Sequence, residues 1–327
     1  MRAWRERDAT DSSLRAEPSR VNRSGLQPPL VIADDYNPSW RRPRAGAAAR
    51  TVRALPRFVA RCLQIIADGL VHHPRRTWAL PLILGTAAFA LLWRWDGALS
   101  ESAARVSASI GGDLRRELHA WQQFGAAGSI VFTSIVVLAL DRTRARRLLD
   151  LYLSVAIAGV ICTTMKMGLG RPRPRPEFED PFTFLGPIGV YPVRQADGSM
   201  RLVHAWEGVL GLGQRGLRAG NELWSMPSSH TLYAAVLAVF LGVMYPRLRW
   251  LWVALALLVG LCRLIFDAHW PTDVIAGACV GLGVAWTVHA RWAGVRLLDW
   301  LWRKIVNPAA TPALPAQQEA FRRKRIG

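Results

Sequence analysis

The sequence contains few cysteines for its length, and their arrangement excludes two kinds of small-domain scaffold. Four cysteines occur in 327 residues, at positions 62, 162, 262 and 279, and no two of them form a CxxC pair. A disulfide-stapled domain or a zinc site would need closely spaced cysteines. Three of them lie in apolar segments, where a free thiol packs as a small hydrophobic side chain. The sequence therefore predicts neither a disulfide framework nor a CxxC metal site.

Acidic residues are also scarce, whereas apolar residues are abundant. Asp and Glu number 23 against 42 Lys and Arg, which gives a formal net charge of +19, yet 51% of the residues are hydrophobic. Long apolar runs alternate with short arginine-rich stretches, a pattern typical of helical membrane proteins. We expect no nucleic-acid partner, because the arginines are spread over tails and loops rather than interleaved with aromatic residues on one element.

The chain begins without the apolar core of a secretory signal peptide, although Arg2, Arg5 and Arg7 come first. Insertion is therefore expected to depend on internal apolar segments. Residues 1–76 are rich in Arg, Pro, Ser and Ala, which predicts a basic, largely disordered cytoplasmic tail. Within it, apolar residues recur at helical spacing over 57–70. This spacing predicts an amphipathic helix that either lies on anionic lipid or packs against the bundle.

Six apolar segments follow, each about long enough to cross a hydrocarbon core of roughly 30 Å. None carries the polar stripe that a helix of a soluble bundle would show. The sequence therefore predicts an all-α fold, a polytopic membrane bundle of six transmembrane helices over 77–291, followed by a basic cytoplasmic tail at 292–327. The six segments are 77–93, 124–140, 148–165, 231–245, 250–266 and 272–289.

Clusters of basic residues indicate the orientation of the bundle. They lie in the link between the second and third segments, in the link between the fourth and fifth, and at the C-terminus. The positive-inside rule places these regions, and with them both termini, in the cytoplasm. The loops after the first, third and fifth segments then face outward from the inner membrane. The clustered residues are Arg142, Arg144, Arg146, Arg147, Arg247, Arg249, Arg322, Arg323, Lys324 and Arg325.

Charged residues at the outward ends of these segments are costly in a membrane and indicate a functional site. Lys166, Arg173 and Arg263 supply fixed positive charge, and an arginine can bind two oxygens at once. Ser228 and Ser229 stand where the fourth helix begins, so free backbone N–H groups and the helix dipole favour an anion there. Together these residues predict a cage for a tetrahedral phosphate.

Two histidines at the same face, His269 and His230, are expected to have different catalytic roles. His269 and Asp273 are four residues apart, so on a helical turn the carboxylate can reach the imidazole and orient it for attack. His230 is left to protonate the departing alkoxide as general acid. No carboxylate cluster of the kind that binds catalytic magnesium accompanies them, so neither a metal ion nor another cofactor is expected.

Three blocks of this region resemble the signature of the phosphatidic acid phosphatase type 2 and haloperoxidase superfamily, in its membrane-bound lipid phosphatase branch. They are KMGLGRPRP at 166–174, PSSH at 227–230 and RLIFDAHWPTD at 263–273. The resemblance implies six spans and an outward active site. It also implies that His269 forms a phosphohistidine supported by Asp273, that His230 is the acid, and that phosphate is bound by Lys166, Arg173, Arg263, Ser228 and the amide of Ser229.

Two positions depart from the family pattern. Ser229 stands where the family usually has glycine, and Cys262 where it often has serine. A side chain at position 229 could crowd the approach of the backbone to phosphate and alter turnover. Neither departure removes a catalytic group.

The long outward segment at 175–226 exceeds an ordinary connection, so we expect it to cap the site and to select the substrate. The expected activity is hydrolysis of a phosphomonoester or diphosphate of a lipid, with the bilayer and the phosphorylated lipid as partners. Three alternatives stay open: a phosphatase for a water-soluble sugar phosphate, a vanadate-dependent haloperoxidase and a non-enzymatic anion transporter. The apolar segments disfavour the haloperoxidase, because its relatives are soluble. The confinement of charge to one end of the segments disfavours the transporter.

Overall fold

The computed structural model describes residues 61, 64, 73–174, 183–194, 199–204, 223–312 and 314. From residue 73 onward these belong to one unit of the chain. Most of the predicted tail at 1–76 lies outside the described residues, and of the predicted helix at 57–70 only Arg61 and Gln64 fall within them.

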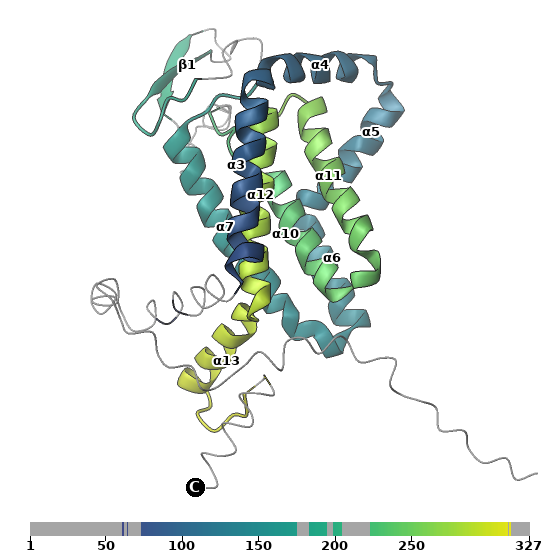
Figure 1. Ribbon diagram of the computed structural model, residues 1–327, viewed down its shortest axis with the longest axis vertical. Helices are drawn as coiled ribbons and strands as arrows, with labels where there is room; N and C mark the ends of the chain where they lie inside the picture. Colours follow the sequence, from purple (N-terminus) through teal and green to yellow (C-terminus); the bar gives the residue numbers. More distant parts are fainter. Residues whose placement is uncertain are drawn as a thin grey trace, which may run out of the picture. The chain divides into compact units, whose positions relative to one another are not determined.

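Helices form at each of the six predicted apolar segments, with bounds close to those expected (Figure 1). The long helices are α3 (Leu80–Leu92), α4 (Asp96–Ser109), α5 (Gly112–Trp121), α6 (Ala127–Leu140), α7 (Leu148–Leu169), α10 (Ser229–Met244), α11 (Arg249–Ile265), α12 (Pro271–Ala290) and α13 (Ala293–Ile305). Short helical turns are Arg75–Ala79, Trp93–Trp95, Gln122–Gly125, Arg142–Arg147 and Pro246–Leu248.

Several helical stretches are long and apolar enough to cross a membrane. Among the described residues four qualify alone: Arg75–Ser109, Arg142–Leu169, Pro246–Ile265 and Pro271–Ala290. Gly112–Gly125 and Ala127–Leu140 form a pair bent by 67°, which gives a fifth span if the pair is counted as one. Ser229–Met244 is a shorter apolar helix. The chain is thus a multi-pass membrane protein, although its number of spans is four or five by this measure rather than the six expected.

Local sequence explains where two of the site-bearing helices begin and end. Gly170 follows α7 in the left-handed region, with φ of 57°, and its N–H bonds to the carbonyl of Lys166 at 3.0 Å. Glycine tolerates this backbone conformation and so ends the helix. Pro271 stands at the first position of α12, where its fixed φ suits the helix and its missing N–H costs nothing. The loop that follows α7 and the loop that precedes α12 therefore lie at the same end of the bundle.

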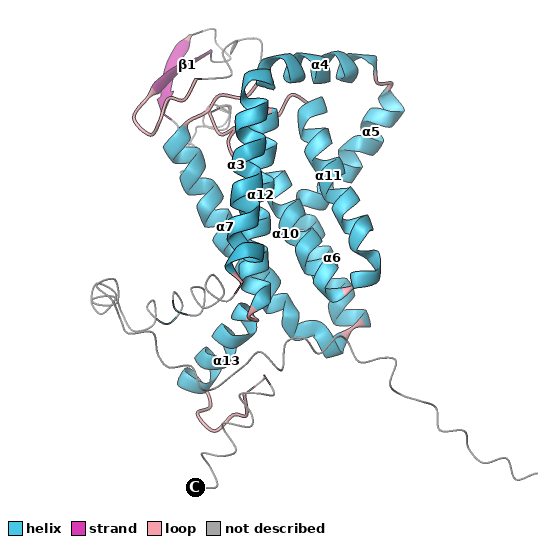
Figure 2. Cartoon of the chain, in the orientation of Figure 1, coloured by secondary structure: helices cyan, strands magenta, loops and turns pink. Residues whose placement is uncertain are grey.

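Five elements were not anticipated from the sequence. Helices α4 and α5 follow the first apolar helix, and α4 runs across the end of the bundle at the top of Figure 1. Strands β1 (Val190–Arg194) and β2 (Met200–His204) pair antiparallel inside the long loop at 175–226 (Figure 2). The all-α prediction omitted this hairpin, whose Val, Tyr and Leu residues favour strands. The fifth element, α13, lies at the opposite end of the bundle from α4 (Figure 1).

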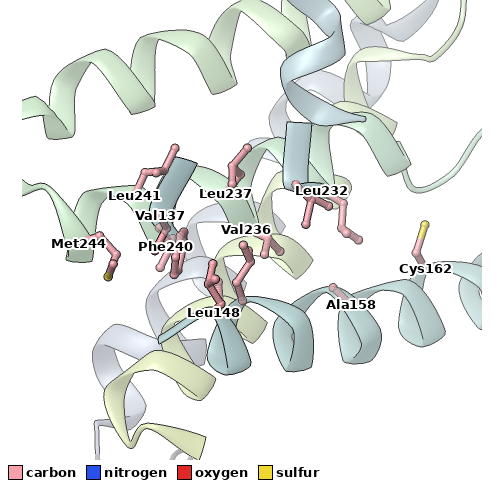
Figure 3. Packing of buried hydrophobic residues seen from close by; sticks show 14 residues of the cluster. Val137, Leu148, Ala158, Cys162, Leu232, Val236, Leu237, Phe240, Leu241 and Met244 are labelled. Carbon is pink, nitrogen blue, oxygen red and sulfur yellow. The ribbon is translucent and has the colours of Figure 1, made fainter. Parts of the chain in front are cut away.

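The core of the bundle is built around α10, which packs against α7, α11 and α12. Its side chains Leu232, Val236, Leu237 and Phe240 are fully buried, and they belong to one apolar cluster with Leu148, Ala158 and Cys162 of α7 (Figure 3). The outer faces of the surrounding helices stay apolar and exposed, with Phe132 among the most exposed at 67%. An apolar exterior of this kind suits contact with lipid and would be unfavourable in water.

Candidate active site

The predicted site residues meet at one end of the bundle, the end that carries α4 and β1 in Figure 1. Lys166 lies in the last turn of α7, and Arg263 lies in the last turn of α11. His230 lies in the first turn of α10, and Asp273 lies in the first turn of α12. Residues as far apart in the chain as Lys166 and Asp273 therefore share one small region.

Two glycines allow the start of α10 to approach its neighbours closely. A Cβ on Gly277 of α12 would lie 2.4 Å from the carbonyl oxygen of Ser228, and one on Gly125 would lie 2.2 Å from that of His230. Ser228 is fully buried, and its N–H bonds to the carbonyl of Asp273 at 3.0 Å. The backbone at the helix start is thus fixed against α12 on one side and the turn after α5 on the other.

Three cationic side chains gather beside this helix start. The Nζ of Lys166 donates to the carbonyl of Trp224 at 2.6 Å, and Nη1 of Arg173 donates to the carbonyl of Ala268 at 3.2 Å. The Nη1 of Arg263 donates to Oε1 of Gln122 at 2.8 Å. The Nε of Arg263 is buried and finds no hydrogen-bond partner among the described residues. These neutral carbonyl groups help to hold the three cationic side chains in place.

These positive charges act on one another and on the two histidines. Lys166 is repelled by Arg173 and Arg263, and all three charges act on His230. His269 is subject to the charges of Arg173 and Lys166. Like charges held together in a buried site are unfavourable until an anion enters. The arrangement therefore suits a ligand with several negatively charged oxygens.

His269 is the most enclosed of the predicted catalytic groups, with 1% of its surface exposed. Its Nδ1 lies 2.7 Å from the carbonyl oxygen of Ser225, so Nδ1 carries the proton and donates it, while Nε2 keeps its lone pair. Burial lowers the pKa of His269 to about 3, and nearby Arg173 and Lys166 act in the same direction. The imidazole is therefore neutral at ordinary pH and has a nitrogen available for nucleophilic attack.

The carboxylate of Asp273 supports His269 mainly through its charge. Its Oδ2 lies 3.8 Å from Nδ1 of His269, a distance that suits an ion pair but is too long for a hydrogen bond. The same oxygen accepts a bond from the N–H of Trp270 at 2.9 Å and one from the hydroxyl of Ser225. Ser225 thus contacts both members of the pair, because its carbonyl binds the imidazole and its hydroxyl binds the carboxylate.

Sequence reasoning gave no role to Asp96 or to Arg171, although Arg171 falls inside the block at 166–174. Arg171 is 1% exposed and bridges two carboxylates, at 2.7 Å to Oδ2 of Asp96 and at 2.6 Å to Oδ1 of Asp273. Oδ1 of Asp96 in turn accepts the N–H of Thr272 at 3.0 Å. The rings of three aromatic residues surround the guanidinium, namely Trp93, Phe184 and Trp270. The signal available in the sequence was an acidic residue directly after the first apolar segment.

The remaining predicted residues, Ser228, Ser229 and His230, lie at the start of α10. The hydroxyl of Ser228 is turned into the protein and accepts a bond from Oγ1 of Thr231 at 3.0 Å. Ser229 and His230 are partly exposed. In the part of the chain that the structure describes, no group of three or more His, Cys, Asp or Glu side chains is placed to hold a metal ion.

Comparison with known proteins gives a family match for this region. A model of the PAP2 superfamily matches residues 147–296. The chain is 37% identical over 67 residues to the bacitracin transport permease protein BcrC of Bacillus licheniformis, covering 19% of this chain and 33% of that protein. It is 35% identical over 57 residues to a lipid A 1-phosphatase of Rhizobium etli, covering 17% of this chain and 25% of that protein. These matches span a third or less of each relative.

Two solved structures are also similar. LpxE of Aquifex aeolicus aligns at 16% identity with a TM-score of 0.38, covering 61% of this chain and 93% of that one. A PAP2-type phosphatidylglycerolphosphate phosphatase from Bacillus subtilis aligns at 21% identity with a TM-score of 0.42, covering 64% and 91%.

Proposed function

Residues 147–296 belong to the PAP2 superfamily, and we propose on this premise that the protein is a metal-independent phosphatase of a membrane lipid. It removes phosphate from a phosphomonoester or a diphosphate at the extracytoplasmic face, and the reaction passes through a phosphohistidine on His269. The observation that carries the proposal is the neutral, buried imidazole of His269 beside the cations Lys166 and Arg173. The stretch shared with a lipid A 1-phosphatase supports the same class of substrate.

In the first step the substrate phosphate enters the cationic cage, where Lys166, Arg173 and Arg263 offset its charge. The Nε2 lone pair of His269 attacks phosphorus, so an N–P bond forms as the P–O bond to the lipid breaks. The lipid leaves as an alkoxide that takes a proton from His230. The negative charge of the bound phosphate favours protonation of His230.

In the second step a water molecule attacks the phosphohistidine. His230 accepts a proton from that water, the N–P bond breaks, and inorganic phosphate leaves. The imidazole of His269 returns to its neutral form with the proton still on Nδ1. During both steps positive charge develops on this ring, and the carboxylate of Asp273 at 3.8 Å stabilises it.

The membrane arrangement follows from the same proposal. If the bent pair that ends in α6 is one span and α10 is another, the described helices supply six spans and return the chain to the side where it began. Arg142, Arg144 and Arg146 lie at the end of the bundle opposite the site, in the turn before α7. Positive residues favour the cytoplasmic side, so the site is assigned to the extracytoplasmic face.

One assay tests the proposed activity. Purified protein in detergent is given lipid phosphates, and phosphate release is measured with and without EDTA and vanadate. We expect release that persists in EDTA, that vanadate inhibits, and that Lys166→Met lowers by about 10²-fold or more, because one preorganised charge is lost. Lys304→Met in α13 is the matched control and should retain full activity. Activity lost on chelation and restored by magnesium would contradict the proposed chemistry.

A further inference from the structure

Gln122 is a buried polar residue that lies beside the candidate active site and outside the three motif blocks. It is 5% exposed and begins the short helical turn Gln122–Gly125, which lies between α5 and α6. This turn packs against α10 and α11, the helices that carry His230 and Arg263. The carbonyl oxygen of the Gln122 side chain accepts the bond from Nη1 of Arg263 at 2.8 Å. The proposed mechanism gives this amide no part.

A second hydrogen bond connects the same amide to a histidine. The Nε2 of Gln122 lies 2.7 Å from Nδ1 of His119, which is in the last turn of α5. The ring of His119 stacks on that of Phe266, with centroids 3.9 Å apart and an interplanar angle of 7°. Phe266 directly follows α11, the helix whose last turn carries Arg263. His119 and Gln122 therefore contact each other and also contact two residues at the end of α11.

The donors and acceptors of this chain of bonds allow one orientation of the amide. A guanidinium can only donate, so the carbonyl oxygen of Gln122 must face Arg263. The amide nitrogen then faces His119 and donates to Nδ1, which must carry a lone pair. The proton of the neutral His119 ring is therefore on Nε2. If the amide were turned over, its nitrogen would face the guanidinium and two donors would oppose each other.

Gln122 engages Arg263 in a way that leaves one edge of the guanidinium available to an anion. An arginine binds two oxygens of a phosphate through two N–H groups on one edge. The edge formed by Nε and Nη2 does not include Nη1, and Nε is buried without a hydrogen-bond partner among the described residues. A long side chain loses rotamer freedom when it is fixed. The acceptor on Nη1 therefore meets this cost before the anion arrives and prepares the edge that contains Nε.

We propose that Gln122 is a positioning residue for Arg263, and that His119 keeps the Gln122 amide in the orientation that this task requires. The inference rests on the proposed phosphatase function, and it adds two residues that act through Arg263 rather than on the phosphate itself. Hydrogen bonds in such a chain polarise one another, so the bond to His119 strengthens the one that the Gln122 carbonyl accepts. Loss of either residue should therefore weaken anion binding through Arg263.

The test measures vanadate binding to the full-length protein in detergent by titration calorimetry, which does not depend on turnover. Gln122→Leu is expected to weaken binding by about 10-fold or more, the cost of losing a hydrogen bond to a charged group. His119→Phe keeps a ring against Phe266 and should weaken binding by about 2- to 10-fold, the effect of one neutral hydrogen bond. Gln123→Leu is the matched control and should leave binding unchanged. Gln123 lies exposed in the same turn, and its amide donates to the carbonyl of His119 at 3.4 Å.

A double variant distinguishes positioning of Arg263 from a merely structural role. In an Arg263→Met background, where Lys166 and Arg173 still bind the anion, Gln122→Leu should cause no further loss, because the group that it positions is absent. Gln122→Glu keeps an acceptor for Arg263 but offsets its charge, so it should weaken vanadate binding and leave the denaturation midpoint unchanged.

Two results would overturn the inference while leaving the phosphatase intact. One is a loss from Gln122→Leu that is as large in the Arg263→Met background as in the wild type. The other is unchanged vanadate binding in both Gln122→Leu and Gln122→Glu. A wild-type protein that neither binds vanadate nor releases phosphate from any lipid phosphate would instead overturn the proposed function on which the inference rests.

Discussion

The carboxylate of Asp273 and the imidazole of His269 lie 3.8 Å apart, and the proton on Nδ1 goes to the carbonyl of Ser225 at 2.7 Å instead. A main-chain group therefore fixes the tautomer and the orientation of the histidine. The carboxylate contributes negative charge close to the ring. These two tasks, which the sequence assigned together to Asp273, are divided between two residues in the structure.

Replacing Asp273 by asparagine should slow the reaction without misorienting His269. Where a carboxylate sets the tautomer itself, its loss costs about 10⁴-fold. Here the Ser225 carbonyl keeps Nε2 unprotonated, so we expect Asp273→Asn to lower kcat by only about 10²-fold, through lost charge support. Asp113→Asn on the exposed face of α5 is the control. A loss near 10⁴-fold for Asp273→Asn would show that the carboxylate, not Ser225, determines the tautomer.

The buried Asp96 should prove important for stability. Its carboxylate pairs with Arg171, and both side chains are fully buried. Removing one partner of a buried ion pair costs about 3–5 kcal/mol, because the remaining charge is left poorly compensated. We expect Asp96→Ala to lower the denaturation midpoint in detergent strongly and to reduce the yield of folded protein. Asp113→Ala, which breaks the exposed pair with Arg116, should change the midpoint little, and equal effects of the two variants would contradict this role.

The positions of the helices and the candidate site residues in the three motif blocks could be predicted from the sequence, because apolar runs and motifs are local patterns. Apolar runs gave the membrane helices to within a few residues, and the resemblance placed Lys166, Arg173 and Arg263 in one family signature. In the structure the charges of Arg173 and Arg263 act on Lys166, and the role of the three residues in binding phosphate stays a prediction. The number of spans was harder to predict, since a bend of 67° before α6 and a short α10 depend on packing rather than on hydropathy.

The partner of Arg171 could not be predicted, because Asp96 lies 75 residues earlier in the chain. Nothing in the local sequence shows that an acidic residue after an apolar segment will be buried rather than solvated. Helix α13 was hidden for another reason. It is amphipathic, with Leu298, Trp302 and Ile305 exposed along one side, and its basic residues made it resemble a tail. The contacts of Ser225 with His269 and Asp273 likewise depend on tertiary structure.

The low pKa of His269 links stability to pH. The folded protein keeps this imidazole neutral down to about pH 3, whereas the unfolded chain protonates it below its ordinary value of 6.5. Its contribution is fully present above pH 6.5 and is lost as the pH falls, at up to about 1.4 kcal/mol per unit. The stability of the wild type relative to His269→Gln should fall by about 2 kcal/mol between pH 7 and pH 5. A difference that stays constant over this range would disprove the neutral, buried state.

The orientation of the site can be tested with single cysteines. Ser199→Cys labels the hairpin at the end of the bundle that carries the site, and Arg142→Cys labels the turn before α7 at the other end. An impermeant thiol reagent added to intact spheroplasts should react with the first variant and not with the second. The wild-type chain supplies the background from its native cysteines. Labelling of Arg142→Cys but not Ser199→Cys would reverse the assigned topology.

Trapping the covalent intermediate tests the proposed chemistry most directly. An activated aryl phosphate leaves without needing a proton, so His230→Ala should still be phosphorylated by it. The second step should be slowed by about 10² to 10⁴-fold, because no base activates the water. Radiolabelled phosphate should then accumulate on the protein as an acid-labile, base-stable adduct that maps to His269, and His269→Ala should take up none. An adduct on another residue, or continued turnover by His269→Ala, would contradict the assignment of His269 as the nucleophile.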